Sequence, residues 1–131
     1  MDRTPVAAAV VVYDGRLLLI RRRVAENLLS WQLPAGKVES GEAPGDAAAR
    51  EALEEAGVGV AAVFLLGERV HPDTGRPMSY WACRLLGGQA RVASPREVAE
   101  IAWVDRQGLA RLVPGGLFGP VQAWLDETLW S

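Results

Sequence analysis

Three glutamates at helical spacing are the residues of this sequence best placed to do chemistry. On a helix that advances by about 100° per residue, Glu51, Glu54 and Glu55 project from one face. Like charges three or four positions apart destabilise an isolated helix, so their convergence requires a compensating charge. Oxygen ligands favour a hard cation, Mg²⁺ or its substitute Mn²⁺, which also accepts phosphate oxygens from a substrate. The alternative is a solvated acidic face on an alanine-rich helix.

A longer pattern around these glutamates favours the metal site. Seven residues stand at fixed spacing in the pattern G-x5-E-x7-R-E-x2-E-E-x-G, namely Gly36, Glu42, Arg50, Glu51, Glu54, Glu55 and Gly57. This pattern is the signature of the Nudix hydrolases, which the chain resembles directly from Gly36 to Gly57. The order of the predicted strands on both sides extends the resemblance over most of the chain.

The resemblance implies an α/β fold, namely a Nudix-type α/β/α sandwich with a mixed β-sheet, as a single domain over residues 1–131. In such enzymes water attacks phosphorus in a nucleoside diphosphate that is linked to another group. A bound metal ion makes water a better nucleophile and shields the negative phosphate oxygens.

The resemblance also implies roles for individual residues. Glu54 and Glu55 would be metal ligands, and Glu51 would be a further ligand or the base that deprotonates water. The backbone carbonyl of Ala35, just before the signature glycine, would reach a metal as well. Glu42 and Arg50 would orient the acidic cluster.

Further catalytic and phosphate-binding residues must come from outside the signature helix. Members of the family often take a second base from a loop far down the chain, where this sequence has Glu97 and Glu100; we favour Glu97 over an ordinary loop charge. Arg21 and Arg23 end a predicted strand on one face, where they meet either the phosphates or solvent. Lys37 follows the signature glycine, so it either screens the phosphates or is a surface charge.

Hydrophobic periodicity and turn residues predict the elements that must position this chemistry. Strands are expected at Val6–Tyr13, Arg16–Ile20, Trp31–Leu33, Val60–Val70, Met78–Leu86 and Ile101–Val104. Helices are expected at Pro44–Ala56, from a cap at Asp105 through Leu112, and at Val121–Leu129. Turns are expected at Asp14-Gly15, which makes a hairpin, and at Pro34-Ala35-Gly36, and Gly57 ends the first helix. Strands on both sides of a central helix, with another helix at the end, predict a mixed sheet covered on both faces.

Trp31 either stacks on a substrate base or joins the core.

Composition and charge restrict the class of protein. The chain has 131 residues, and its 14 basic residues nearly balance 16 acidic ones. We therefore expect neither a nucleic acid nor a membrane surface as partner, and no apolar stretch reaches the roughly 18 residues of a membrane span. Cys83 is the only cysteine, which excludes an internal disulfide and fits a reducing, cytoplasmic location. A monomer and a homodimer both fit the sequence.

The shortness of the chain and its complete set of signature acids favour one function among those that the resemblance implies. This is a Mg²⁺-dependent, MutT-like pyrophosphohydrolase that converts a nucleoside triphosphate, including damaged or non-canonical ones, to the monophosphate and pyrophosphate. Leu33-Pro-Ala-Gly-Lys37 resembles the turn in ADP-ribose pyrophosphatases, so ADP-ribose or another nucleotide sugar is the alternative substrate. A catalytically silent Nudix-fold nucleotide sensor is a further alternative, although such proteins typically lose signature acids. The lack of a broad basic surface disfavours RNA decapping.

Overall fold

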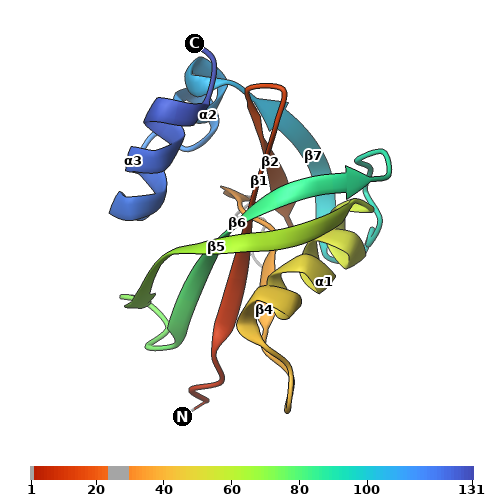
Figure 1. Cartoon of the computed structure of the whole chain (residues 1–131), viewed down its shortest axis with the longest axis vertical. Helices are drawn as coiled ribbons and strands as arrows, with labels where there is room; N and C mark the ends of the chain where they lie inside the picture. The colour runs from red at the N-terminus through yellow and green to blue at the C-terminus, as the bar shows by residue number, and fades with distance from the viewer. Residues whose placement is uncertain (1, 24–29) are drawn as a thin grey trace.

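The computed structural model describes residues 2–23 and 30–131, where seven strands and three helices follow one another along the chain (Figure 1). The strands are β1 (Val6–Tyr13), β2 (Arg16–Arg22), β3 (Ser30–Gln32), β4 (Ala35–Lys37), β5 (Gly59–Val70), β6 (Pro77–Gly87) and β7 (Val98–Val104). The helices are α1 (Pro44–Ala56), α2 (Arg106–Leu112) and α3 (Gly119–Thr128).

The strands form one mixed sheet, as the sequence predicted. Its order is β3-β2-β1-β6-β5, with β4 paired to β1 and β7 paired to β2. The central strands β1 and β6 run parallel, whereas the other paired strands run antiparallel. The predicted α/β fold is therefore confirmed.

The hairpin between β1 and β2 follows from its two turn residues. Asp14 and Gly15 both have left-handed backbone conformations, with φ of 53° and 69°. Two successive left-handed residues make the type I′ turn, whose twist matches that of the flanking strands. The hairpin brings Tyr13 opposite Arg16, as expected.

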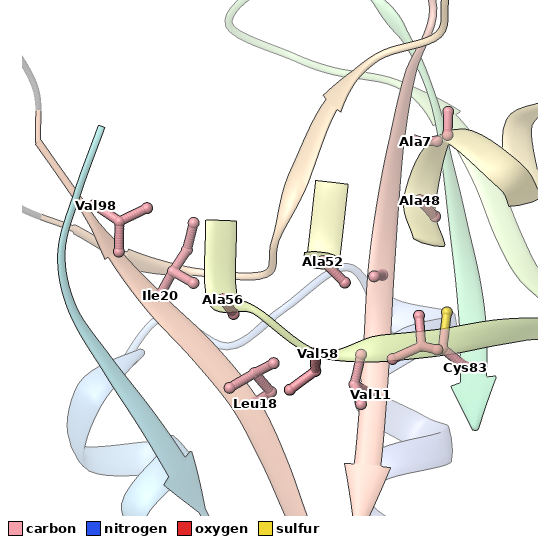
Figure 2. Close-up of a cluster of buried hydrophobic side chains, with 13 residues drawn as sticks. Ala7, Val11, Leu18, Ile20, Ala48, Ala52, Ala56, Val58, Cys83 and Val98 are labelled. Carbon is pink, nitrogen blue, oxygen red and sulfur yellow. The ribbon is translucent and has the colours of Figure 1, made fainter. Parts of the chain in front are cut away.

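Alternation along the central strands gives the sheet two buried faces. One face carries Ala7, Ala9, Val11, Leu18 and Ile20, and the other carries Ala8, Val10, Leu17 and Leu19. On the first face α1 packs through Ala48, Ala52 and Ala56, whose short side chains let the helix lie close to the strands (Figure 2). The second face is covered by α2 and α3, through residues such as Leu109, Val121 and Leu125. Helices thus cover both faces, with α1 on one side and α3 on the other (Figure 1).

The ends of α1 fix the position of the signature. Pro44 stands in the first turn, where its missing N–H costs nothing. At the other end Gly57 is left-handed, with φ of 73°, and its N–H donates to the Leu53 carbonyl at 3.0 Å. The last turn is tied to the loop before β7, because Ala93 N–H donates to the Glu55 carbonyl at 3.2 Å.

Several expected boundaries differ from the observed ones by one or two residues, and three of the differences concern pairing or larger shifts. The segment expected as a turn at 34–36 includes the start of β4, because its backbone pairs with β1 through Ala35 opposite Ala8. β7 begins at Val98, three residues before the expected start, because Val98 pairs with Arg22. The final helix begins at Gly119. In the described part of the chain, no helix has the length and apolar character needed to cross a membrane.

Candidate active site

Five of the seven signature residues line a cleft of 460 Å³; Glu42 and Gly57 are not among its lining residues. It lies where the end of β2, β4, α1 and the loop before β7 meet. Its lining residues are Arg22, Ala35, Gly36, Lys37, Glu39, Arg50, Glu51, Glu54, Glu55 and Glu97. Half of these residues are glutamates, so the cleft attracts cations.

Glu55 is the most deeply buried acid of the cleft, with 1% of its side chain exposed. Its Oε1 accepts a hydrogen bond from the backbone N–H of Ala35 at 3.0 Å. Its Oε2 has no hydrogen-bond partner among the described residues, and Arg22 Nη1 lies 3.6 Å away. Burial, followed by the charge of Glu51, raises the pKa of Glu55 to about 8. When ionised, this carboxylate has the Arg22 contact, but within the described structure its Oε2 is without the hydrogen bond that a buried charge requires.

Glu51 lies directly against the backbone of Gly36. A Cβ atom at position 36 would overlap the carboxyl group of Glu51, so only glycine leaves room for this side chain. Burial raises the pKa of Glu51, and the Arg50 guanidinium partly opposes that shift. The packing of Glu51 on α1 thus explains why the signature has glycine at position 36.

Arg50 joins the loop before α1 to the acids of α1. Its Nε and Nη2 donate to the two carboxylate oxygens of Glu42 at 2.9 and 3.0 Å. Its Nη1 donates to Glu51 at 2.8 Å and contacts Glu54 at 3.4 Å, while Nη2 also donates to the Lys37 carbonyl at 2.9 Å. The hydrogen bonds from Arg50 lower the pKa of Glu42 to about 2. A guanidinium with this many partners can hold the acids in place, and the orienting role of Arg50 stays a prediction.

The donor set of the cleft fits a divalent cation. It contains only oxygen ligands, which Mg²⁺ and Mn²⁺ prefer, and it includes the unpartnered Oε2 of Glu55. Within residues 2–23 and 30–131, no three side chains already converge as a metal-ligand cluster. Arg50 meanwhile contacts both Glu51 and Glu54 and supplies part of the counter-charge.

Of the three arginines at the end of β2, the structure brings Arg22 to the cleft, not Arg21 or Arg23. Arg21 lies opposite Glu100 in the β2–β7 ladder and donates to it at 2.9 Å. Arg23 Nε donates to the carbonyl of Pro95 at 2.9 Å. Alternation separates Arg22 from its two neighbours, as the sequence predicted, but the sequence did not show which face would meet α1. Arg22 was therefore missed, although it follows Leu18 and Ile20 on the face that α1 covers.

The two acids of the distal loop occupy different places. Glu97 is exposed and lines the cleft, and its charge contributes to raising the pKa values of Glu51 and Glu55. Glu100 is instead the ion-pair partner of Arg21. The position of Glu97 accords with a second base, and that role stays a prediction.

The structure places the other two expected substrate-binding residues differently, with Lys37 at the cleft and Trp31 outside its lining. Lys37 lines the cleft, but its Nζ lies 3.0 Å from Oδ2 of Asp2. Trp31 is half-buried and packs against the core on the α3 side of the sheet, away from the residues that line the cleft. Of the two alternatives for Trp31, its packing favours a place in the core.

A second pocket adjoins the cleft through Ala35, which lines both. It has a volume of 190 Å³ and lies on the α3 side, between β1, β4, β5 and β6. Its lining residues are Ala8, Gln32, Leu33, Ala35, Arg69, His71, Met78, Tyr80 and Leu117. A larger hollow of 490 Å³ near the start of β1 has Glu68 and Arg69 as its charged lining residues, and Arg69 also lines the second pocket. With one acid among its described lining residues, this hollow lacks the clustered carboxylates of the cleft.

A family model described as the NUDIX domain matches residues 3–118. The chain therefore belongs to the Nudix family, as its signature predicted.

Individual relatives agree with this assignment. The chain is 38% identical over 99 residues to a MutT-like protein of Streptomyces ambofaciens, an alignment that covers 76% of this chain and 61% of that protein. It is 34% identical over 128 residues to a putative 8-oxo-dGTP diphosphatase 2 of Mycobacterium tuberculosis, covering 86% of this chain and 89% of that protein. A Nudix hydrolase structure from Nitrosomonas europaea superposes with a TM-score of 0.79 at 22% identity, over 97% of this chain and 72% of that one. The chain spans 61% and 64% of the lengths of the Streptomyces relative and a Bacillus subtilis relative.

Proposed function

We propose that this protein is a divalent-cation-dependent nucleotide pyrophosphohydrolase. It would convert a nucleoside triphosphate to the monophosphate and pyrophosphate by attack of water on phosphorus. The observation that carries this proposal is the buried Glu55 carboxyl, whose Oε2 has no hydrogen-bond partner in the described structure. Such an oxygen, beside two further signature acids in an open cleft, fits a cation that also binds phosphate.

The residues of the cleft divide the work of this reaction. Glu54, Glu55 and the Ala35 carbonyl would hold the ion, and Glu51 would either join them or accept the proton of the attacking water. A bound Mg²⁺ or Mn²⁺ would lower the pKa of water and neutralise phosphate charge. Arg50 keeps the acids in place through its hydrogen bonds.

Substrate contacts would come from the basic and exposed groups at the edge of the cleft. Arg22 lines the cleft with its Nη1 3.6 Å from Glu55, and it would bind a phosphate oxygen. Glu97 lies across the same cleft and would serve as a second base. The phosphates of the triphosphate would occupy the cleft, with the nucleoside toward the pocket beyond Ala35. We also propose a cytoplasmic location.

The test is hydrolysis by the purified protein, with Mg²⁺ or Mn²⁺, of nucleoside triphosphates, 8-oxo-dGTP, ADP-ribose and a nucleotide sugar. We expect pyrophosphate and a monophosphate from a triphosphate substrate. Glu54→Gln and Glu55→Gln should each lower turnover by at least about a hundredfold. Glu127→Gln, which changes an exposed acid on α3, is the matched control and should leave turnover unchanged. If ADP-ribose is the only compound cleaved, the proposed triphosphate substrate is wrong. Equal rates for the wild type and all variants would overturn the assignment of the site.

A further inference from the structure

Arg69 of β5 places a guanidinium group at the second pocket and is held there by two aromatic rings. Its Nε donates to the hydroxyl of Tyr80 at 3.0 Å. Its Cζ lies 4.9 Å from the ring centre of Phe118 and 5.6 Å from that of Tyr80. Contacts of a guanidinium with aromatic faces are favourable and limit its orientations. The arginine is therefore preorganised before any ligand binds.

Arg69 differs from the half-buried Arg50 and Arg76 in having no acidic partner in the described part of the chain. Arg50 and Arg76 each bind a carboxylate, of Glu42 and Asp2 respectively. Among the described residues, no Asp or Glu lies within ion-pair distance of Arg69. Its two Nη atoms also have no hydrogen-bond partner there, although a guanidinium has five N–H donors. A half-buried cation with free donors is suited to an acceptor that a ligand brings.

The rest of the pocket has the character of a site for a flat ring. Leu33, Met78 and Leu117 supply apolar walls. His71 Nδ1 accepts a hydrogen bond from the Asp73 N–H at 3.1 Å, so a neutral imidazole carries its proton on Nε2 and is a donor. The volume of 190 Å³ is below the roughly 300–1,000 Å³ of sites that hold a whole small ligand. It therefore suits one part of a nucleotide.

We propose that Arg69 selects the base of the substrate by donating its two Nη groups to O6 and N7 of a guanine ring. This inference rests on the proposed nucleotide hydrolase function and adds the class of base to it. The planar fork of arginine matches these two neighbouring acceptors, which is why arginine is the commonest partner of guanine. Adenine presents an amino donor where guanine has O6, and that donor would face the guanidinium donors. Ala35 joins the base pocket to the acidic cleft, so one nucleotide can occupy both.

The test compares kcat/KM for GTP, ATP and CTP in the wild-type protein, Arg69→Gln and Arg69→Lys. We expect the wild type to favour GTP, and both substitutions to lower the GTP-to-ATP ratio by about 5- to 100-fold, mainly through KM for GTP. Lysine keeps the charge but not the fork, so it should not restore the preference. Arg84→Gln, at an exposed position on neighbouring β6, is the matched control and should keep the wild-type ratio. Thermal unfolding checks that each variant folds.

Each other outcome overturns the inference in an identifiable way. An Arg69→Gln variant that loses activity equally on GTP and ATP would assign Arg69 to phosphate binding. Rescue of the ratio by Arg69→Lys would show that positive charge, and not the planar fork, selects the base, and would overturn the bidentate contact. A wild type that favours ATP or CTP would exclude guanine recognition. If no nucleotide is hydrolysed, the proposed function fails by itself; calorimetric binding of GMP and AMP to wild type and Arg69→Gln then tests Arg69 separately. Equal affinities for GMP and AMP, or no binding of either, would overturn its role.

Discussion

The three signature glutamates of α1 have the same chemistry but very different surroundings. The side chains of Glu55, Glu51 and Glu54 are 1%, 12% and 55% exposed. The two less exposed acids both have raised pKa values because burial disfavours their charged forms. Glu54 is left facing solvent, with Arg50 as its ion-pair partner. One helix turn thus provides one solvent-exposed carboxylate, Glu54, and two less exposed ones, Glu51 and Glu55, whose negative charges must be balanced by groups within the cleft.

At the residue scale, Gly36→Ala should inactivate the protein without unfolding it. The added methyl group would overlap the carboxyl group of Glu51, so this side chain must leave its place in the cleft. We expect kcat to fall by at least about tenfold, because catalytic groups tolerate only small displacements. Steady-state kinetics on the substrate found in the panel would measure this loss, and circular dichroism would report on the fold.

Gly87→Ala is the matched control for this substitution. Gly87 stands at the end of β6, where an added Cβ meets no atom within 4 Å. Its activity should therefore equal that of the wild type. Unchanged kcat in Gly36→Ala would contradict a catalytic role for the observed Glu51 position.

At the scale of the element, the alanine face of α1 sets how closely the helix approaches the sheet. Ala48, Ala52 and Ala56 are fully buried against strands β1 and β2 and against Val58 (Figure 2). Replacing Ala52 by Leu would insert three heavy atoms into this packed layer. We expect the free energy of unfolding to fall by about 1–3 kcal/mol, the usual cost of overpacking a core. Urea unfolding measures this change.

Leu53→Ala tests whether the effect belongs to the buried face. Leu53 is the next residue along α1 but is 55% exposed, so its truncation should change stability by no more than about 0.5 kcal/mol. Activity also reports on α1, because a shifted helix displaces the glutamates. A fully stable Ala52→Leu variant would mean that the helix and sheet can separate without cost.

The elements show how far the sequence could predict this site. The seven-residue signature located the acids and Arg50, because their spacing is set within one loop and one helix. The hairpin at Asp14-Gly15 was likewise a local property of its turn. Tertiary pairing determined the rest: β4 exists because its backbone bonds to β1, and Arg22 meets Glu55 because α1 covers one particular face of β2. Arg69 is far from the signature in sequence, and only folding brings its strand beside Ala35.

At the scale of the whole molecule, the charge is unevenly distributed. The segment from Gly36 to Gly57 has six acidic and two basic residues, a net charge of −4, whereas the entire chain has −2. The remainder therefore carries +2. The fold concentrates the acids of this segment around a cleft and buries Glu55 within it. The stability of the metal-free protein should then depend on pH.

The sign of that dependence follows from the raised pKa of Glu55. Its ordinary value is 4.5, and in the folded protein it is about 8. Between these values the folded state holds a proton that the unfolded state has lost, so stability is greatest below about pH 4.5 and decreases as pH rises toward 8. Glu51 shifts in the same direction. Glu42 is shifted the opposite way, to about 2, so its contribution is lost only in acid, below this window.

We therefore predict that wild-type protein in EDTA loses on the order of 3 kcal/mol of unfolding free energy between pH 5 and pH 8.5. Urea unfolding at a series of pH values measures this slope. Glu55→Gln removes the titrating group and should flatten most of it, whereas Glu127→Gln, at an exposed position of α3, should keep the wild-type slope. Mg²⁺ should restore stability at pH 8.5 in wild type, because an ion that binds only the folded state stabilises it, and should do so less in Glu55→Gln. Identical slopes in wild type and Glu55→Gln would show that the buried carboxyl is not what links folding to pH, whereas a Mg²⁺ effect equal in both would place the ion elsewhere.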